Sequence, residues 1–336
     1  MKKKPLIALI GTGGTIAGSA PSRTQSARYL PASVGVEAIV DGIPELRENY
    51  AVSLAQPFQL ASYDMAPRQW MQLLGVVGAA LADPAVDGAI ITHGTDTLEE
   101  TAFFLHLSLD TIKPAVLVGA MRPSTAYSAD GPANILDAFR VASDGGACGR
   151  GCLVVMNGRI HGARDVSKRH VSSVEAFDSG LAGAVGEVSD QQVRWFQRAW
   201  RPPVLSLDLR AELPRVDIVA SYAGSDAVAL EACVKAGARG IVHAGLGNGN
   251  APPGVREALQ TLVNKGVALG RCSRWIPGGL TRNSTMFDDD RLGIWTAGAL
   301  PPHKLRIAMM VAIAHGLKGS DVQAWLDRVV EPASTA

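Results

Sequence analysis

The fold is decided by the stretch Leu6-Ile-Ala-Leu-Ile-Gly-Thr-Gly-Gly-Thr-Ile-Ala-Gly18, close to the start of the chain. Its first five residues form a continuous apolar run, which is typical of a strand buried on both faces of a parallel sheet. Glycines and two hydroxyl side chains, Thr12 and Thr15, follow at once. Ligands of open α/β sheets bind at the carboxyl ends of the strands, so we expect a functional site here.

More runs of this kind predict the remaining strands of the fold. They are Gly88–Ile91, Ala115–Val118, Cys152–Met156, Asp217–Ala220, Gly240–His243 and Val267–Leu269. Helical patterns lie between them or after them, at Thr95–Leu109, Ala227–Ala236, Lys304–Gly316 and Asp321–Val330. Strands that alternate with helices predict an α/β fold with mostly parallel sheets.

The domain organisation follows from the length and from one break in this pattern. A chain of 336 residues is typical of two domains. The proline-punctuated segment 201–214 interrupts the alternation of strands and helices. We therefore expect a larger N-terminal α/β domain over residues 1–200, a linker over 201–214 and a smaller C-terminal α/β domain over 215–336.

Composition excludes several classes of protein. Hydrophobic residues make up 47% and charged residues 19%, so the chain can bury a sizeable core. The net charge of +1 does not predict binding to nucleic acid or to a membrane surface. No apolar stretch approaches the roughly 18 residues of a transmembrane helix. The four cysteines show no zinc-like clustering. We expect neither a metal nor a cofactor.

The N-terminus superficially resembles a signal peptide, because three lysines precede Leu6–Ile10. The apolar segment is short, however, and it runs into the glycine loop without a cleavage region, so we interpret it as a buried strand. We therefore expect a cytoplasmic protein. A periplasmic location stays open if the sequence is that of a processed protein.

The glycine loop does not fit the common nucleotide-binding motifs. A dinucleotide motif that starts at Gly11 would need glycine where Ile16 stands, and no Gly-Lys-Ser/Thr of a Walker motif follows. Two interpretations remain. The loop is either a turn with two solvated threonines or a site at which the hydroxyl of Thr12 or Thr15 acts on a ligand.

The segment Thr92-His-Gly-Thr-Asp-Thr97 also follows an apolar strand and precedes a helix. Capping alone could explain it, because Thr97 and Glu100 form a capping-box signature. Alternatively, the free N–H groups of the helix N-terminus could receive an oxyanion or a carboxylate, with Asp96 suited to an ammonium group. We expect His93 to be a hydrogen-bonded core histidine rather than a metal ligand.

A third candidate is Lys168, which ends the segment Gly162-Ala-Arg-Asp-Val-Ser-Lys168. A lysine beside strand ends can take part in proton transfer to a hydroxyl. Most lysines simply face water, so this segment alone is a weak signal.

Together these segments resemble the bacterial-type L-asparaginase family over nearly the whole chain. Thr12–Gly18 resembles the first active-site signature and Ile91–Thr101 the second. Further family-like stretches are Val118–Ser124, Ser128–Pro132, Val154–Asn157 and Ala244–Asn250. The resemblance implies hydrolysis of L-asparagine to L-aspartate and ammonia through a threonine nucleophile and an acyl-enzyme, with minor glutaminase activity. It also implies two α/β domains and a homotetramer built as a dimer of dimers.

The resemblance also implies the catalytic residues. Thr15 matches the nucleophile on the N-terminal loop, and Tyr29 matches the tyrosine that hydrogen-bonds and activates it. Thr95, Asp96 and Lys168 match a hydroxyl, carboxylate and lysine set that faces the scissile amide. Which threonine attacks is a role inherited from the family.

The implied substrate-binding residues come from both domains. Ser62 and Asp96 match residues that hold the α-carboxylate and α-ammonium groups, and Asn250 matches a residue supplied across a subunit interface. The full implied set is Gly14, Ser62, Tyr63, Gly94, Thr95, Asp96 and Asn250.

Two positions depart from the family pattern. Tyr63 stands where the family commonly has glutamine or glutamate, and we expect it to narrow the pocket and disfavour glutamine as a substrate. The stretch Trp275–Asp290 contains no counterpart of a family glutamate that reaches the neighbouring subunit, so either Thr285 or Asp288 replaces it or the contact is lost. We interpret the run Asp288–Asp290 as a solvated turn rather than a metal site.

Two other functions compete with a free-amino-acid amidohydrolase. One is the ammonia-supplying subunit of a tRNA-dependent amidotransferase, which would favour an appended N-terminal domain; only ten residues precede Gly11, so we do not expect it. The other is a catalytically impaired amino-acid sensor that retains the asparaginase pocket. The presence of the whole catalytic set argues against a sensor, whereas the change at Tyr63 and the missing glutamate favour one.

Overall fold

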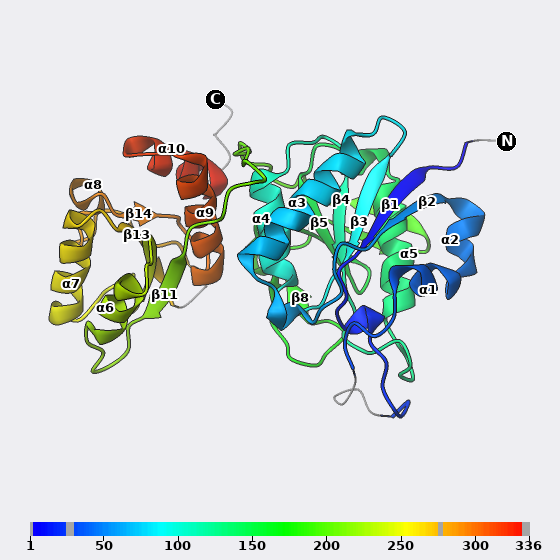
Figure 1. The fold of residues 1–336 in the computed structure, drawn as a ribbon, viewed down its shortest axis with the longest axis horizontal. Helices are drawn as coiled ribbons and strands as arrows, with labels where there is room; N and C mark the ends of the chain where they lie inside the picture. The colour runs from blue at the N-terminus through cyan, green and yellow to red at the C-terminus, as the bar shows by residue number, and fades with distance from the viewer. Residues whose placement is uncertain (1–2, 25–29, 275–277, 331–336) are drawn as a thin grey trace. The chain divides into compact units, whose positions relative to one another are not determined.

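The computed structural model describes residues 3–24, 30–274 and 278–330. The chain divides into two compact units, Met1–Arg201 and Pro202–Ala336 (Figure 1). Each has its own sheet, and the predicted α/β class with mostly parallel sheets is confirmed.

The sheet of the first unit has eight strands in the order β10-β9-β6-β5-β4-β3-β1-β2. The five parallel strands are β1 (Leu6–Gly11), β2 (Ala51–Ala55), β3 (Gly88–Thr92), β4 (Ala115–Val118) and β5 (Cys152–Met156). Antiparallel pairing adds β6 (Arg159–Gly162), β9 (Gly186–Ser189) and β10 (Gln192–Trp195). A separate hairpin joins β7 (Ser167–Lys168) to β8 (Phe177–Asp178).

Helices cover both faces of this sheet, which explains the continuous apolar character of the central strands. On one face lie α1 (Val36–Asp41), α2 (Pro44–Asn49) and α5 (Gly131–Ala142), and on the other α3 (Pro67–Ala82) and α4 (Leu98–Ser108) (Figure 1). Every residue of β3 is buried. The short 3-10 helices are η1 (Thr15–Ala17), η2 (Ser62–Asp64), η3 (Gly145–Ala147) and η4 (Gly180–Ala182).

The second unit contains a parallel sheet in the order β11-β12-β13-β14. Its strands are β11 (Val216–Ala220), β12 (Gly240–Gly245), β13 (Ala268–Ser273) and β14 (Trp295–Thr296). Its helices are α6 (Val228–Lys235), α7 (Pro253–Asn264), α8 (Asp289–Leu292), α9 (Pro302–His315) and α10 (Ser320–Val330). In the described part of the chain, no helix has the length and apolar character needed to cross a bilayer.

The interpretation of Asp288–Asp290 as a solvated turn is wrong for its central residue. Asp289 is 0% exposed and forms an ion pair with Arg271, whose Nε and Nη2 atoms lie 2.7 and 2.5 Å from its carboxylate oxygens. A buried charge needs such a partner, because an unpaired one costs several kcal/mol. Asp288 begins α8, where its side chain accepts a hydrogen bond from the Arg291 N–H.

Candidate active site

The candidate site lies at the carboxyl ends of β1 and β3, which are neighbours in the sheet. Gly11 is in register with Thr92, and the Thr12 N–H donates to the Thr92 carbonyl oxygen over 3.2 Å. The loops that follow the two strands therefore leave the sheet side by side.

Two glycines let these loops approach each other closely. A Cβ atom at Gly14 would lie 2.2 Å from the backbone nitrogen of Gly94, and one at Gly94 would lie 2.6 Å from Ser62 Oγ. Gly14 also has a φ of +82°, which side chains rarely tolerate. Glycine is thus required at both positions for the loops after β1, β2 and β3 to converge.

The structure distinguishes the two hydroxyls of the first loop. Thr12 and Thr15 are 2% and 6% exposed, so the alternative of a turn with solvated threonines is wrong. The Thr12 hydroxyl donates its single proton to the Thr92 carbonyl oxygen over 2.7 Å. Thr15 begins η1, directly after the loop glycines. The Thr12 hydroxyl thus helps to join the loops after β1 and β3, and the role of Thr15 as the nucleophile stays a prediction.

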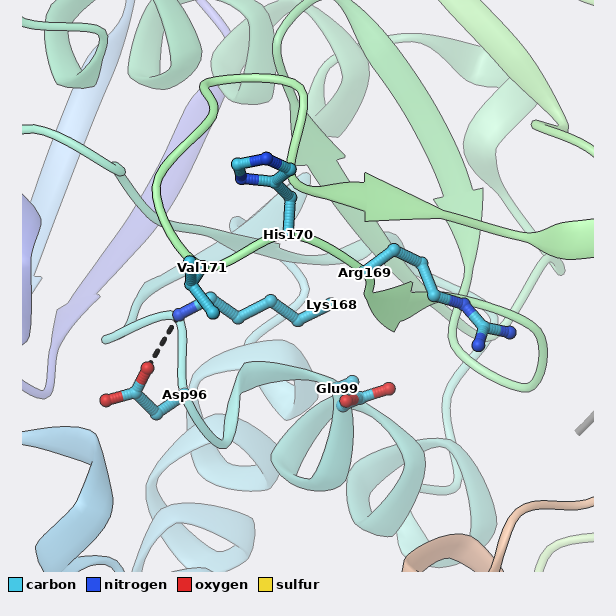
Figure 2. Close-up of a pocket in the computed structure, with 6 residues that line it drawn as sticks. All are labelled: Asp96, Glu99, Lys168, Arg169, His170 and Val171. Carbon is cyan, nitrogen blue, oxygen red and sulfur yellow. Dashed lines mark hydrogen bonds and ion pairs between the residues drawn. The ribbon is translucent and has the colours of Figure 1, made fainter. Parts of the chain in front are cut away.

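Lys168 reaches the second loop from β7. Its Nζ atom donates to Thr95 Oγ1 over 3.0 Å. The same atom donates to Asp96 Oδ1 over 2.6 Å (Figure 2). The Lys168 side chain is 17% exposed, whereas that of Asp96 is 55% exposed and open to a ligand. The predicted hydroxyl, carboxylate and lysine therefore lie within hydrogen-bonding distance, although 72 positions separate Asp96 from Lys168.

Ser62 ties the start of α4 to the loop after β2, and it corrects the expected capping box. The Thr97 hydroxyl donates to the Ser62 carbonyl oxygen over 2.7 Å, and the Asp96 N–H donates to Ser62 Oγ over 3.2 Å. Thr97 does precede the helix, but its side chain makes no capping hydrogen bond. The Thr97 hydroxyl instead contacts the Ser62 carbonyl oxygen, and its oxygen accepts no N–H of the first helical turn.

A pocket of about 380 Å³ opens beside the Lys168–Asp96 pair. Figure 2 shows its lining residues, which are Asp96, Glu99, Lys168, Arg169, His170 and Val171. Sequence reasoning missed Glu99, Arg169 and His170, although each stands within three positions of a predicted site residue. The His170 Nδ1 atom accepts from the N–H groups of Ser172 and Ser173, so its imidazole shapes the turn beside the pocket.

A further segment supports the nucleophile loop. Ser124 donates to the Gly18 carbonyl oxygen from its hydroxyl over 2.8 Å and from its N–H over 3.1 Å. Asp130 in turn accepts from the N–H groups of Met121 and Arg122, both over 2.9 Å. The stretch Val118–Pro132 thus holds the first loop in place, a role that no local pattern revealed.

His93 is a hydrogen-bonded core histidine, as predicted. It is 1% exposed, and both ring nitrogens have partners. Burial lowers the pKa of its imidazole to about 4, so the ring is neutral at pH 7. No group of side chains in the described ranges has the composition of a metal site.

The structure does not test the roles of three other predicted site residues, Tyr63, Asn250 and Tyr29. Tyr63 follows Ser62 in η2 and is 68% exposed. Asn250 belongs to the second unit, where it closes a turn by exchanging backbone hydrogen bonds with Leu246. Tyr29 lies outside the described residues. The roles of all three stay predictions.

Comparisons with known proteins match both units. The family model for "Asparaginase, N-terminal" matches residues 6–201, and the model for "Glutaminase/Asparaginase C-terminal domain" matches residues 215–326. The chain is 38% identical to "L-asparaginase 2" of Bacillus subtilis (strain 168) over 97% of its length and 87% of that protein. It is 40% identical to "Glutaminase-asparaginase" of Pseudomonas fluorescens biotype A over 94% of its length and 88% of that protein.

A solved structure agrees with these matches. It is described as "Probable Cytoplasmic L-asparaginase" from Campylobacter jejuni, and it superposes with a TM-score of 0.92 at 34% sequence identity. The superposition covers 97% of this chain and all of the other.

Proposed function

Because this chain belongs to the asparaginase family, we propose that it is an L-asparaginase that hydrolyses L-asparagine to L-aspartate and ammonia, with minor activity on L-glutamine. The observation that carries the proposal is the hydrogen-bonded set of Lys168, Thr95 and Asp96 beside the buried loop of Thr15. These side chains are the parts needed for acyl transfer: a nucleophile, a proton carrier and a charged anchor for the substrate.

In the proposed reaction, the Thr15 hydroxyl attacks the side-chain amide carbon of the substrate. A tetrahedral intermediate forms and collapses to an ester with Thr15, while the amide nitrogen takes up a proton and leaves as ammonia. A water molecule then attacks the ester, releases L-aspartate and returns the proton to Thr15. The Thr95 hydroxyl, bonded to Lys168, carries protons, and we assign Tyr29 to the activation of Thr15.

The α-ammonium group of asparagine requires an anionic partner, and its α-carboxylate requires a hydrogen-bond donor. The half-exposed carboxylate of Asp96 is suited to the α-ammonium group. Ser62 Oγ accepts from the Asp96 N–H, which leaves its own proton available for the α-carboxylate. Gly14 and Gly94 complete the pocket by allowing the backbone of their loops to approach the substrate.

We further propose an assembly, domain boundaries and a location for this protein. We propose a homotetramer in which Asn250 completes the site of a neighbouring subunit, with the domain boundaries given above. We also propose a cytoplasmic location. Leu6–Gly11 pairs with both β2 and β3, which agrees with the interpretation of this segment as a buried strand.

The function is tested by measuring ammonia release from L-asparagine and L-glutamine. We expect turnover of L-asparagine at a rate typical of enzymes, about 1–10³ s⁻¹, with slower release from L-glutamine. D-Asparagine serves as the control, because its inverted α-carbon misplaces the groups that Asp96 and Ser62 bind. A folded protein that binds asparagine without releasing ammonia would instead support the sensor function.

The exposed phenol of Tyr63 provides a test of substrate selectivity. We expect Tyr63→Gln to raise activity on glutamine relative to asparagine by roughly tenfold, since one methylene in a pocket is worth about 1–3 kcal/mol. The measurement is kcat/KM for both amides, with Tyr63→Phe as the matched variant that keeps the ring. An unchanged ratio in Tyr63→Gln would mean that the ring does not limit the pocket.

A further inference from the structure

A chain of hydrogen bonds runs from α3 through α4 into the loop that carries Thr95. The Trp70 Nε1 atom lies 3.0 Å from Thr101 Oγ1, which lies 2.9 Å from His93 Nε2. The other ring nitrogen, His93 Nδ1, lies 2.7 Å from the Gly94 carbonyl oxygen. All three side chains are buried, with exposed fractions of 3% for Trp70, 0% for Thr101 and 1% for His93.

The two ends of this chain determine the position of every proton within it. An indole N–H can only donate and a carbonyl oxygen can only accept. Thr101 Oγ1 therefore accepts from Trp70, and its own proton is available for His93 Nε2. His93 Nδ1 must carry a proton to donate to the Gly94 carbonyl oxygen. His93 is thus the neutral tautomer with its proton on Nδ1.

The bond to Gly94 orients the peptide that joins Gly94 to Thr95. The carbonyl and N–H groups of a trans peptide point in opposite directions, so holding the Gly94 oxygen also aims the Thr95 N–H. Within the ranges that the structure describes, we find no acceptor for that N–H. Gly94 has no side chain to restrict its own rotation, and Ser62 Oγ leaves no room for one.

We propose that His93 is a positioning residue for the amide hydrolysis, holding the Gly94–Thr95 peptide so that the Thr95 N–H meets the oxygen on which negative charge develops. The proposal rests on the proposed function, because it needs a tetrahedral intermediate. A donor of this kind is effective because it is already oriented when the charge forms, and losing one typically costs about 10²–10³ in kcat. The ring of Trp70 stacks on that of Phe104 with a centroid distance of 5.4 Å, so Trp70 anchors the far end of the hydrogen-bond chain in the core.

Two substitutions of similar polarity separate positioning from mere packing. The amide nitrogen of asparagine can occupy the place of Nδ1 and still donate to the Gly94 oxygen, whereas glutamine can reach only the place of Nε2. We expect His93→Gln to lower kcat by about 10²-fold with KM changed only a few-fold. His93→Asn should retain at least tenfold more activity than His93→Gln. Thermal unfolding of both variants controls for stability.

A second pair of variants changes Thr101, which lies one hydrogen bond further from Gly94 than His93 does. This pair tests the proposal even if neither His93 variant folds. Thr101→Val removes the hydroxyl at nearly constant volume and leaves His93 Nε2 without its donor, whereas Thr101→Ser keeps it. We expect a lower kcat in Thr101→Val and its restoration in Thr101→Ser. Equal kcat values in the two Thr101 variants would count against the chain of hydrogen bonds.

A readout independent of activity is the ¹⁵N spectrum of the protein labelled at histidine, in which His93→Asn identifies the His93 signals. We expect a protonated Nδ1 and an unprotonated Nε2 at pH 7. A proton on Nε2, or equal losses of kcat in the two His93 variants of an active enzyme, would overturn the role of His93. A parent protein without amidohydrolase activity would instead overturn the proposed function itself.

Discussion

Replacement of Thr15 by alanine is expected to abolish ammonia release from L-asparagine. The nucleophile is lost while the Lys168–Thr95–Asp96 set stays intact. Removing a nucleophile of comparable enzymes lowers kcat by as much as about 10⁶-fold, so we expect a loss of at least roughly 10⁴-fold, which corresponds to about 5 kcal/mol of transition-state stabilisation. The measurement is kcat under saturating asparagine, with L-aspartate binding as the check that the site is still formed.

Two companion variants sharpen this result. Thr15→Ser keeps a hydroxyl at the same position and should retain measurable activity. Thr12→Val removes the neighbouring hydroxyl, whose proton is donated to the Thr92 carbonyl oxygen over 2.7 Å. We expect that change to lower stability by about 1 kcal/mol and to preserve most of the activity. If Thr12→Val were inactive and Thr15→Ala active, the assignment of the nucleophile would be reversed.

The second large effect is expected from Lys168→Met, which keeps most of the side-chain stem and removes the ammonium group. The change breaks the contacts to Thr95 Oγ1 at 3.0 Å and to Asp96 Oδ1 at 2.6 Å. Proton transfer by a positioned side chain contributes typically about 10²–10⁴-fold, so we expect kcat to fall within that range. KM should rise less, since the Asp96 carboxylate stays in place.

Lys168→Arg and Lys113→Met are the matched variants. A guanidinium group stays charged and has a planar geometry, so it is not expected to replace an ammonium that exchanges a proton with Thr95. Lys113 binds the Asp83 carbonyl oxygen on the surface, and its replacement by methionine should leave kcat unchanged. Full activity in Lys168→Met would show that the lysine only packs against the loop.

Much of the architecture could be predicted because it depends on local patterns. The runs at β3, β4 and β5 are apolar without alternation, which occurs when helices cover both faces of a parallel sheet. The edge strand β2 escaped prediction because three of its five residues are exposed. A strand at the edge of a sheet has no such continuous apolar run to mark it.

The site was predicted in part for the same reason. Polar residues directly after the central strands β1 and β3 must meet at one edge of the sheet, and this places Thr15 near Thr95 and Asp96. The roles carried over from the family rest on its signatures rather than on any physical pattern. Glu99, Arg169 and His170 were missed because a polar or charged residue a few positions from a site residue resembles an ordinary solvated surface residue.

The sequence by itself determined the fold class, most of the parallel strands of the two sheets and the edge at which the site forms, because apolar periodicity and strand-end loops are properties of single segments. Tertiary structure alone decided which partner binds each hydroxyl proton and each buried carboxylate. Thr12 gives its proton to Thr92 and Thr97 gives its proton to Ser62, while Asp289 is buried against Arg271. Each of those partners lies between 18 and 80 positions away along the chain. A hydrogen bond or ion pair between distant segments depends on how they pack together, which no local pattern records.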